Sequence, residues 1–513
     1  MLVVVAALAA CGGQPAPLAP ATPTEVPTAA PLPSLDLVLS KISTPVPTPT
    51  ATPAPTPAAG EPLEASDYYE SRSNMFRIFS GPNHPVGVAL EGVQKARANK
   101  DRSQFPIILE IKPYFPSPEF QLEAEATLKA LSGQPPEGVE WIWPQWMEWL
   151  GANAAEFQPP EGYADWKSVL MTVFDPRYRD FFPPGSKTAN VDLTEVIWGG
   201  VSPESNPDLQ SPAHVAADEA EYLLPDDRVY GLSIDGEVRA YPLRIVNTHE
   251  IVNDVLGGES VVLTHSILVG AGIAYRSDVN GSAATFGTSG MIYRSDPVMF
   301  DRVTNTLWLQ YTGQPIMGAA AEPGFALERV PVLLTTWQEW KDRHPGTTVL
   351  SGATAFYGAE TYISESTPGS MLLQYESFDD TIFPIWNRSD SLGLKDLVLG
   401  VGIDGSYKAY AVPALQQAVV LNDTVGAAEI VVVASATSQA ARVYDRDGLE
   451  FSAGDAPAEI LDADGARWRV DEEYLVNVDD PSRRLPRLAT HMSYWLAWYA
   501  FYPETEVYGI DGG

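Results

Sequence analysis

The chain has 513 residues, of which 66 are acidic and 32 are basic, and its formal net charge at pH 7 is -34. Such a charge repels nucleic-acid phosphates and anionic lipid headgroups, so a nucleic-acid partner is not expected. An apolar content of 45% is enough to build cores in two or three domains. The single cysteine, Cys11, excludes an internal disulfide, a Cys-x-x-Cys redox pair and cysteine-ligated zinc.

The first eleven residues resemble a bacterial lipoprotein signal. Residues 1–10 form an apolar run too short to span a bilayer, and Leu8-Ala9-Ala10-Cys11 is similar to a lipobox. A lipobox implies cleavage before Cys11 and lipidation of that residue, so we expect Cys11 to anchor the chain to the cell envelope outside the cytoplasm. No Lys or Arg precedes the apolar run, which departs from the usual pattern. The alternative is an ordinary apolar N-terminus with a chance cysteine.

Three segments with different compositions follow the signal. Residues 12–65 are rich in Pro, Thr and Ala, which predicts a disordered stalk with polyproline II character. Residues 66–185 repeat apolar side chains every three or four positions, which predicts a helical domain. Its tryptophans at helical spacing are typical of core positions, although a ligand-stacking platform is the alternative. Residues 186–227 are acidic and Pro-rich, and we interpret them as a connector that wraps the following domain.

Two later stretches share one plan. Residues 228–351 and 396–510 each begin with an Asp-Gly pair between alternating apolar residues, which predicts a tight β-hairpin. Short β-branched runs separated by Gly, Asn and Asp follow in both stretches, and a Trp-x-x-Trp segment closes each one. We therefore predict two homologous, mainly-β repeats that each end in a short helix, with residues 352–395 as an interdomain excursion. The expected fold class is multidomain α+β.

Several long motifs of the first repeat occur in a specific order. They are RAYPLRIVNTHEIVND, VVLTH, SGMIYRSDPVMFDRVTNTLW and TTWQEWKDRHPGTTVLS. In this order they resemble the uncharacterised bacterial family known as domain of unknown function 3179, over about residues 190–510. Members of that family typically carry a Cys-Pro-Leu-Cys-Gly segment, which implies thiol redox chemistry or metal binding. Ser266 and Val269 occupy both cysteine positions here, so the thiol chemistry is not carried over.

The candidate site consists of residues of the first repeat, and its best candidates have no polar counterpart in the second repeat. His249, Glu250 and His265 correspond to apolar residues in the second repeat, whereas Asn253-Asp254 recurs there and is typical of turn chemistry. Burial of an ionisable group is costly unless the group is paired, is solvated or has a function. The residues that occur in the first repeat only are therefore the better candidates. The candidate catalytic residues are His249, Glu250, His265 and Asp301, the candidate binding residues are Ser266, Trp308 and His344, and the candidate metal ligands are His249 and His265.

Three interpretations of the function remain open. The first is an extracytoplasmic binding or scaffold protein, held at the membrane by its lipid anchor, with an extracytoplasmic protein or a small molecule as partner. The second is an enzyme with a non-thiol site in the first repeat; no cofactor is predicted, and a metal ion is the alternative within this interpretation. The third is a descendant of thiol-redox proteins that serves only as a structural partner to a relative with intact cysteines. We expect His249 and His265 to line one polar concavity. The alternative is that His249 binds a backbone carbonyl and His265 faces solvent.

Overall fold

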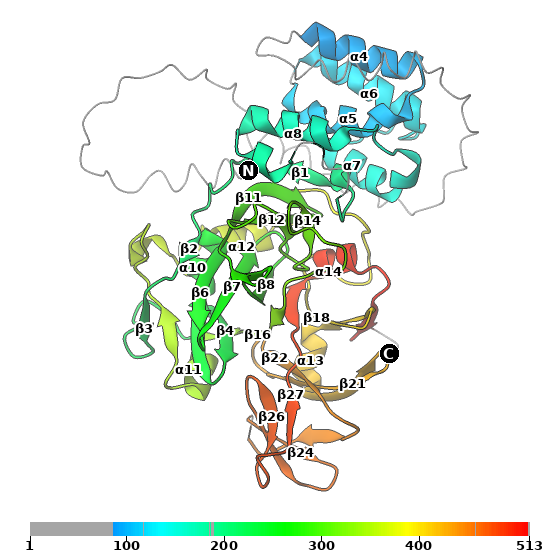
Figure 1. The fold of residues 1–513 in the computed structure, drawn as a ribbon. Helices are drawn as coiled ribbons and strands as arrows, with labels where there is room; N and C mark the ends of the chain where they lie inside the picture. Colours follow the sequence, from blue (N-terminus) through cyan, green and yellow to red (C-terminus); the bar gives the residue numbers. More distant parts are fainter. Residues whose placement is uncertain (1–85, 116, 184, 186–188, 457, 511–513) are drawn as a thin grey trace, which may run out of the picture.

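The computed structural model describes residues 86–510, except residues 116, 184, 186–188 and 457 (Figure 1). The expected signal, Cys11 and the stalk lie outside these residues. The described chain is an α+β structure, with a helical region followed by several β-sheets and short helices. In this part of the chain, no helix is both long and apolar enough to cross a bilayer.

The helical region is built around buried aromatic side chains. Proline at the first position of its longest helix and Gly133 at φ 73° just beyond that helix are a standard start and stop. Trp146 and Trp166 are buried, which gives them core positions. Inside this core, Lys167 Nζ lies 2.6 Å from the Glu110 carboxylate. The helices are α4 (Val86–Ala98), α5 (Phe105–Ile111), α6 (Pro118–Ser132), α7 (Trp143–Ala152), α8 (Tyr163–Phe174) and α9 (Tyr178–Phe181).

The first β unit contains three five-stranded sheets, and the connector supplies one edge strand to each of them. The first sheet has the order β16 (Val332–Thr336), β4 (Arg228–Ile234), β5 (Glu237–Pro242), β17 (Thr348–Leu350), β3 (His214–Ala216). The second has the order β15 (Arg329–Val330), β8 (Ala271–Arg276), β7 (Glu259–Ser266), β6 (Ile251–Leu256), β2 (Leu209–Gln210). The third has the order β1 (Val196–Trp198), β11 (Phe286–Tyr293), β12 (Asp296–Asp301), β13 (Leu307–Leu309), β14 (Pro315–Met317). A small hairpin of β9 (Asp278–Val279) and β10 (Ser282–Ala283) completes the unit.

The second β unit also contains three sheets, with fewer strands in two of them. Its first sheet has the order β28 (His491–Tyr494), β18 (Leu397–Ile403), β19 (Ser406–Ala411), β29 (Glu506–Tyr508). Its second has the order β20 (Val420–Val425), β21 (Ala428–Ala434), β22 (Ala441–Asp445). Its third has the order β23 (Phe451–Ala453), β24 (Glu459–Asp462), β25 (Arg467–Val470), β26 (Tyr474–Asn477), β27 (Arg484–Pro486).

The two units match in local detail. The hairpin residues Asp235 and Asp404 have φ angles of 50° and 48°, as the Asp-Gly pairs predict. The Tyr241 hydroxyl donates to Asp254 at 2.8 Å, and a Tyr-Asp hydrogen bond of 2.9 Å occupies the corresponding place in the second unit. Asn253 exchanges two hydrogen bonds with the backbone of Phe286, and this exchange also recurs. The residues retained in both units therefore hold the fold together.

Each unit contains a second short helix that the sequence pattern did not predict. The helix α10 (Leu243–His249) follows the hairpin of the first unit, and α13 (Val412–Ala418) follows that of the second. The final helices, α11 (Trp337–Arg343) and α14 (Trp495–Phe501), are in the expected places, and α12 (Met371–Glu376) lies in the excursion. The helix α10 matters for the site because it ends at His249, whose side chain therefore projects from a helix terminus and not from a strand.

Candidate functional site

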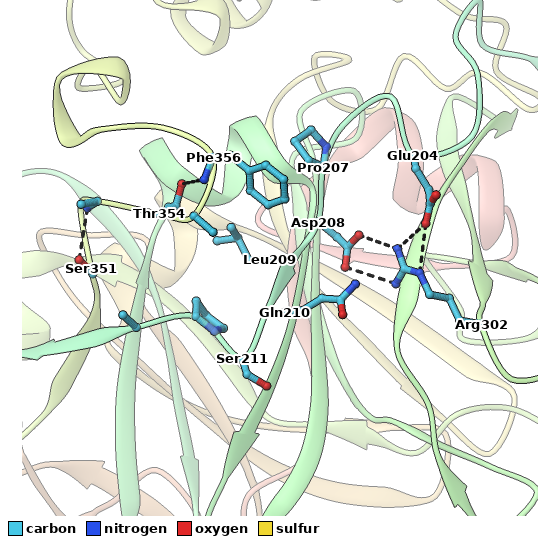
Figure 2. A pocket seen from close by; sticks show the side chains of 14 residues that line it. Glu204, Pro207, Asp208, Leu209, Gln210, Ser211, Arg302, Ser351, Thr354 and Phe356 are labelled. Carbon is cyan, nitrogen blue, oxygen red and sulfur yellow. Dashed lines mark hydrogen bonds and ion pairs between the residues drawn. The ribbon is translucent and has the colours of Figure 1, made fainter. Parts of the chain in front are cut away.

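A hollow of about 640 Å³ lies beside the first unit (Figure 2). Residues 204–213, which we call the strap, form one wall, together with Arg302 from the turn after β12. Residues 351–356, the 351–356 loop, form the other wall. The 351–356 loop is irregular, and the strap is irregular except for the two-residue edge strand β2. Loops that a sheet scaffold holds in place are a common setting for a binding site.

The strap side of the hollow carries a charged cluster. Arg302 Nη2 lies 2.6 Å from Asp208 Oδ1 and 2.7 Å from Glu204 Oε1. A second hydrogen bond fixes Asp208, because Asn253 Nδ2 donates to its Oδ2 at 2.8 Å. Glu204 also pairs with Arg177 at 3.4 Å, and Arg177 pairs with Asp175 at 2.7 Å. Three carboxylates therefore surround two guanidinium groups, which leaves this cluster with one negative charge in excess. An anionic ligand is disfavoured at such a wall.

The loop side presents a hydroxyl and an aromatic ring. Thr354 Oγ1 accepts a hydrogen bond from the backbone N–H of Tyr357 at 3.1 Å, which holds the loop in a turn. The Phe356 side chain is 52% exposed and lines the hollow. A large aromatic ring that stays exposed beside polar groups offers an apolar face to a ligand.

His249 connects the two walls. Its Nδ1 lies 2.5 Å from the Pro207 carbonyl in the strap, and its Nε2 lies 2.7 Å from the Tyr362 hydroxyl. That hydroxyl lies 2.6 Å from Thr354 Oγ1. Burial lowers the pKa of His249, so the imidazole is neutral near pH 7. Its Nδ1–H then donates to the carbonyl, and its Nε2 accepts from Tyr362, which in turn accepts from Thr354.

The residue after His249 has an unusual environment. Glu250 has φ 61°, which is rare for a residue other than glycine, and burial raises the pKa of its carboxyl to about 7. Burial also raises the pKa of Asp296 well above its usual range, and the nearby charge of Glu250 adds to this effect. Both carboxyls therefore favour the protonated form more than exposed acids do.

His265 and His249 have no hydrogen-bond partner in common. His265 Nδ1 lies 3.0 Å from the Tyr230 hydroxyl, and its Nε2 lies 3.2 Å from Asn247 Oδ1. Burial, together with the charge of Arg228, lowers the pKa of His265 to about 3. His249 does bind a backbone carbonyl, but His265 is only 2% exposed, so the alternative in which His265 faces solvent was wrong.

The other candidate residues lie elsewhere in the first unit. Asp301 Oδ2 accepts from Trp308 Nε1 at 2.9 Å, and Asp462 with Trp468 repeats this hydrogen bond at the same distance in the second unit. That recurrence indicates a structural role for Asp301 and Trp308. Ser266 is 3% exposed, and its hydroxyl has no hydrogen-bond partner among the described residues.

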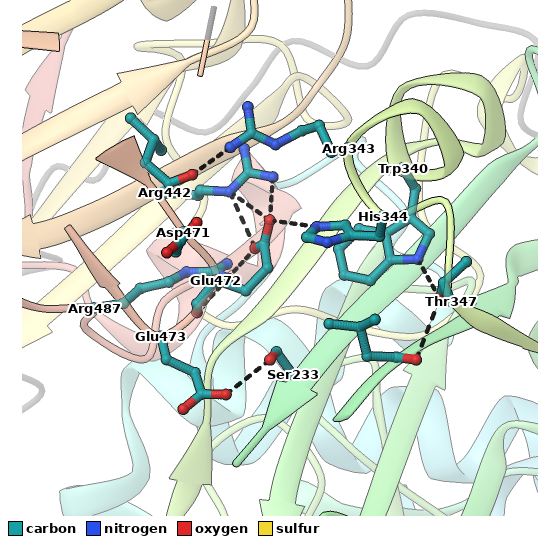
Figure 3. Close-up of polar contacts among 12 residues, drawn as sticks. Ser233, Trp340, Arg343, His344, Thr347, Arg442, Asp471, Glu472, Glu473 and Arg487 are labelled. Carbon is teal, nitrogen blue, oxygen red and sulfur yellow. Dashed lines mark hydrogen bonds and ion pairs between the residues drawn. The ribbon is translucent and has the colours of Figure 1, made fainter. Parts of the chain in front are cut away.

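His344 lies at the contact between the two units (Figure 3). Its Nε2 is 3.1 Å from Glu472 Oε1, and Arg442 and Arg487 bind the same carboxylate. None of these residues lines the hollow. The cluster joins the end of α11 to the turn between β25 and β26. Over residues 86–510, with the gaps given above, no three His, Cys, Asp or Glu side chains form a group that could hold a metal ion.

A comparison with known protein families shows the family to which the chain belongs. The profile of one family, described as "Protein of unknown function (DUF3179)", matches residues 204–505. The chain belongs to this family. The match includes both β units except β1 and β29, and it includes the strap and the 351–356 loop, so both walls of the hollow lie inside the DUF3179 region. Neither the curated proteins nor the solved structures contain a match to the chain.

Sequence reasoning found His249 but missed the residues around it in this DUF3179 chain. Asp208 lies in the connector, and Thr354 and Tyr362 lie in the excursion, which has no clear periodicity. Tyr362 is 113 residues from His249 along the chain, so no local pattern links them. The only available signal was the concentration of Tyr, Phe and Ser in an otherwise irregular segment.

Proposed function

We propose that this DUF3179 protein is an extracytoplasmic, lipid-anchored binding protein whose small-molecule ligand occupies the hollow. The observation that carries this proposal is the position of His249, which hydrogen-bonds to the strap directly and to the 351–356 loop through Tyr362. Two largely irregular walls are therefore held at a set spacing before any ligand arrives. A pre-organised site loses less conformational entropy on binding than a flexible one.

The lining favours a neutral ligand with several hydroxyl or amide groups. The excess negative charge around Arg302 opposes an anion, and Thr354 and Gln210 supply hydrogen-bonding groups. Phe356 offers an apolar surface on which one face of the ligand can pack. A saccharide or a short peptide has this combination of a polar edge and an apolar face.

The test is a binding panel on the full chain. Neutral mono- and disaccharides, amino acids and dipeptides are screened by thermal shift, and positive compounds are measured by calorimetry. Phe356→Ala should weaken binding by about tenfold or more, since an aromatic contact of this size is commonly a principal determinant of affinity. Thr172→Val is the matched control, because Thr172 lines a separate hollow of about 470 Å³ in the helical region. Equal losses in both variants, or no binding compound in the panel, would contradict the proposal.

The same hydrogen-bonded chain favours a second candidate function, an enzyme that uses Thr354 as nucleophile. Its hydroxyl proton could pass to Tyr362 as the Tyr362 proton passes to His249 Nε2, so that the imidazole becomes the net proton acceptor. The corresponding reaction class is acyl transfer, in which Thr354 Oγ1 forms an ester and the leaving group departs with a proton. Tyr362→Phe interrupts the proton path. An esterase activity that survives this substitution would eliminate the candidate.

We further propose that the two β units arose by duplication of one ancestral unit. The recurrent Tyr-Asp, Asn-backbone and Asp-Trp hydrogen bonds support this origin, as do the equivalent strand orders around each hairpin. Shared descent explains why these bonds recur while His249 does not. An experimental structure in which the two units fail to superpose over their hairpins and following helices would refute the duplication.

A further inference from the structure

A second polar cluster lies in the contact between the β units, centred on Tyr311. This residue follows β13 in the first unit, and its hydroxyl lies 2.7 Å from Ser493 Oγ on β28 of the second unit. Its ring packs edge-on against the imidazole of His491, with 4.9 Å between the ring centroids. Its carbonyl accepts a hydrogen bond from Arg329 Nη2 at 2.7 Å. Tyr311 therefore brings groups from both units together.

Two buried side chains near Tyr311 have polar atoms without a hydrogen-bond partner, and the Arg329 guanidinium beside them is hydrogen-bonded to the Tyr311 carbonyl and to Tyr502 but has no carboxylate partner among the described residues. His491 is 2% exposed, yet neither of its ring nitrogens has a hydrogen-bond partner among the described residues. Gln310 is equally buried, and its Nε2 likewise has no partner within that part of the chain. No carboxylate of the described residues lies within ion-pair distance of the partly exposed Arg329 guanidinium, although most arginines of this acidic protein have such a partner.

We propose that Arg329, His491 and Gln310 form a binding site for a small organic carboxylate at the contact between the two units. An unpartnered buried donor is costly, and an acceptor that binds several such donors removes that cost. The site is independent of the hollow proposed above, and its residues come from β15, β28 and the turn after β13.

The charge and shape of the cluster select a carboxylate over other anions. Burial and the charge of Arg329 hold the pKa of His491 well below its usual range, so the imidazole is neutral and Arg329 supplies the positive charge. One positive charge matches a monoanion better than a dianionic phosphate. A guanidinium also binds the two oxygens of a carboxylate through parallel hydrogen bonds.

Aromatic rings give this site an apolar wall for the organic part of the ligand. Phe501 stacks on Tyr311 with 4.4 Å between the ring centroids, and Tyr502 stacks on Tyr407 at 4.2 Å. Phe501, Tyr502 and Tyr407 are all partly exposed, so the wall reaches the surface. An aromatic or aliphatic acid therefore fits better than an inorganic anion.

The test measures carboxylate binding to the full chain at constant pH and ionic strength. Benzoate, acetate and inorganic phosphate are compared by calorimetry, and a tripeptide with a free C-terminus is compared with its amidated form. Benzoate should bind most tightly, and phosphate should bind most weakly. Binding of the free tripeptide but not of benzoate would reassign the carboxylate to a peptide C-terminus, which overturns the assignment to a small acid.

Variants separate the site from nonspecific ion binding. Arg329→Gln should weaken benzoate binding by about tenfold or more, because it removes the charged hydrogen bonds. Arg276→Gln is the matched control, since Arg276 is a partly exposed arginine that pairs with Glu259 and Glu328. Gln310→Met keeps the side-chain volume and removes one donor, so it tests the same site if Arg329→Gln does not fold.

A crystal structure with bromobenzoate gives the decisive location. Anomalous density next to His491 and Arg329, lost in the Arg329→Gln variant, supports the proposal. The proposal is overturned if the density shows only water at these donors or places the ligand only elsewhere. It is also overturned if the Arg329→Gln and Arg276→Gln variants bind benzoate with equal affinity.

Discussion

Glu472 Oε1 lies 3.1 Å from His344 Nε2, across the contact between the two β units. Arg442 and Arg487 bind the same carboxylate, and all of these groups except His344 are almost fully buried (Figure 3). The next residue, Glu473, accepts hydrogen bonds from Ser233 and from the backbone of the first unit's hairpin turn. Two consecutive acidic residues of the second unit therefore bind the first unit, Glu472 at the end of α11 and Glu473 at the hairpin.

Replacement of Glu472 should weaken the contact between the units more than replacement of Glu473. Glu472→Gln leaves two buried guanidinium groups without their counter-charge, and we expect a loss of about 3–5 kcal/mol in the free energy of unfolding. Glu473→Gln, the control, removes a partly exposed contact and should cost about 1 kcal/mol or less. Chemical denaturation of both variants measures the difference. Similar losses would show that the buried cluster does not hold the units together.

The lowered pKa of Glu472 predicts how the free energy of unfolding changes at acidic pH. Burial alone would raise the pKa of Glu472, but the charges of Arg442 and Arg487 and the hydrogen bond from His344 lower it well below its ordinary value of 4.5. A folded-state pKa below the unfolded value contributes stability above pH 4.5, which is lost as the pH falls further. The stability difference between wild type and Glu472→Gln should therefore narrow below pH 4.5. A constant difference from pH 7 to pH 3 would contradict this assignment.

Removal of one hydroxyl should loosen the walls of the hollow. Tyr362→Phe deletes the group that joins His249 to Thr354, and we expect a loss of about 1–2 kcal/mol and faster amide hydrogen exchange in the 351–356 loop. Tyr474→Phe is the control, because Tyr474 is 37% exposed and lies in the second unit. Unchanged exchange in the loop would show that the hydrogen-bonded chain does not set the spacing of the walls.

The pH dependence of the hollow follows from His249. Burial lowers its pKa below the ordinary value of 6.5, so the folded state favours the neutral imidazole. This preference contributes stability above pH 6.5 that is lost as the pH falls through the folded-state pKa. Below that pKa, Nε2 carries a proton and can no longer accept from Tyr362. Exchange in the 351–356 loop should then rise with acid in wild type and stay flat in His249→Asn.

The proposed lipid anchor predicts that membrane attachment depends on Cys11. Cys11→Ser should move the protein from the detergent phase to the aqueous phase in cells that process lipoproteins, since the acyl chains provide the membrane affinity. The control is Ser34→Ala, a substitution in the predicted stalk that leaves the predicted lipobox unchanged. If the wild type and Cys11→Ser partition equally, the lipoprotein assignment fails.

The features that the sequence determined by itself are local or repeated. Asp235-Gly236 and Asp404-Gly405 specify their hairpins because those residue types tolerate a positive φ, and the structure has these turns. The order of long motifs indicated the family, and the family match bears this out. Both features depend on neighbouring residues, whose conformational preferences act over a few positions.

Only the tertiary structure decided what surrounds the candidate side chains. His249 was singled out because it lacks a counterpart in the second unit, but its partner Tyr362 comes from an irregular segment 113 residues away. His344 was a candidate ligand-binding residue, and its partner Glu472 lies 128 residues along the chain in the other unit. Irregular segments have no hydrophobic period to reveal their placement, because packing against the sheets sets their positions. The identity of a polar residue shows which bonds it can make, and the folded chain selects its partner.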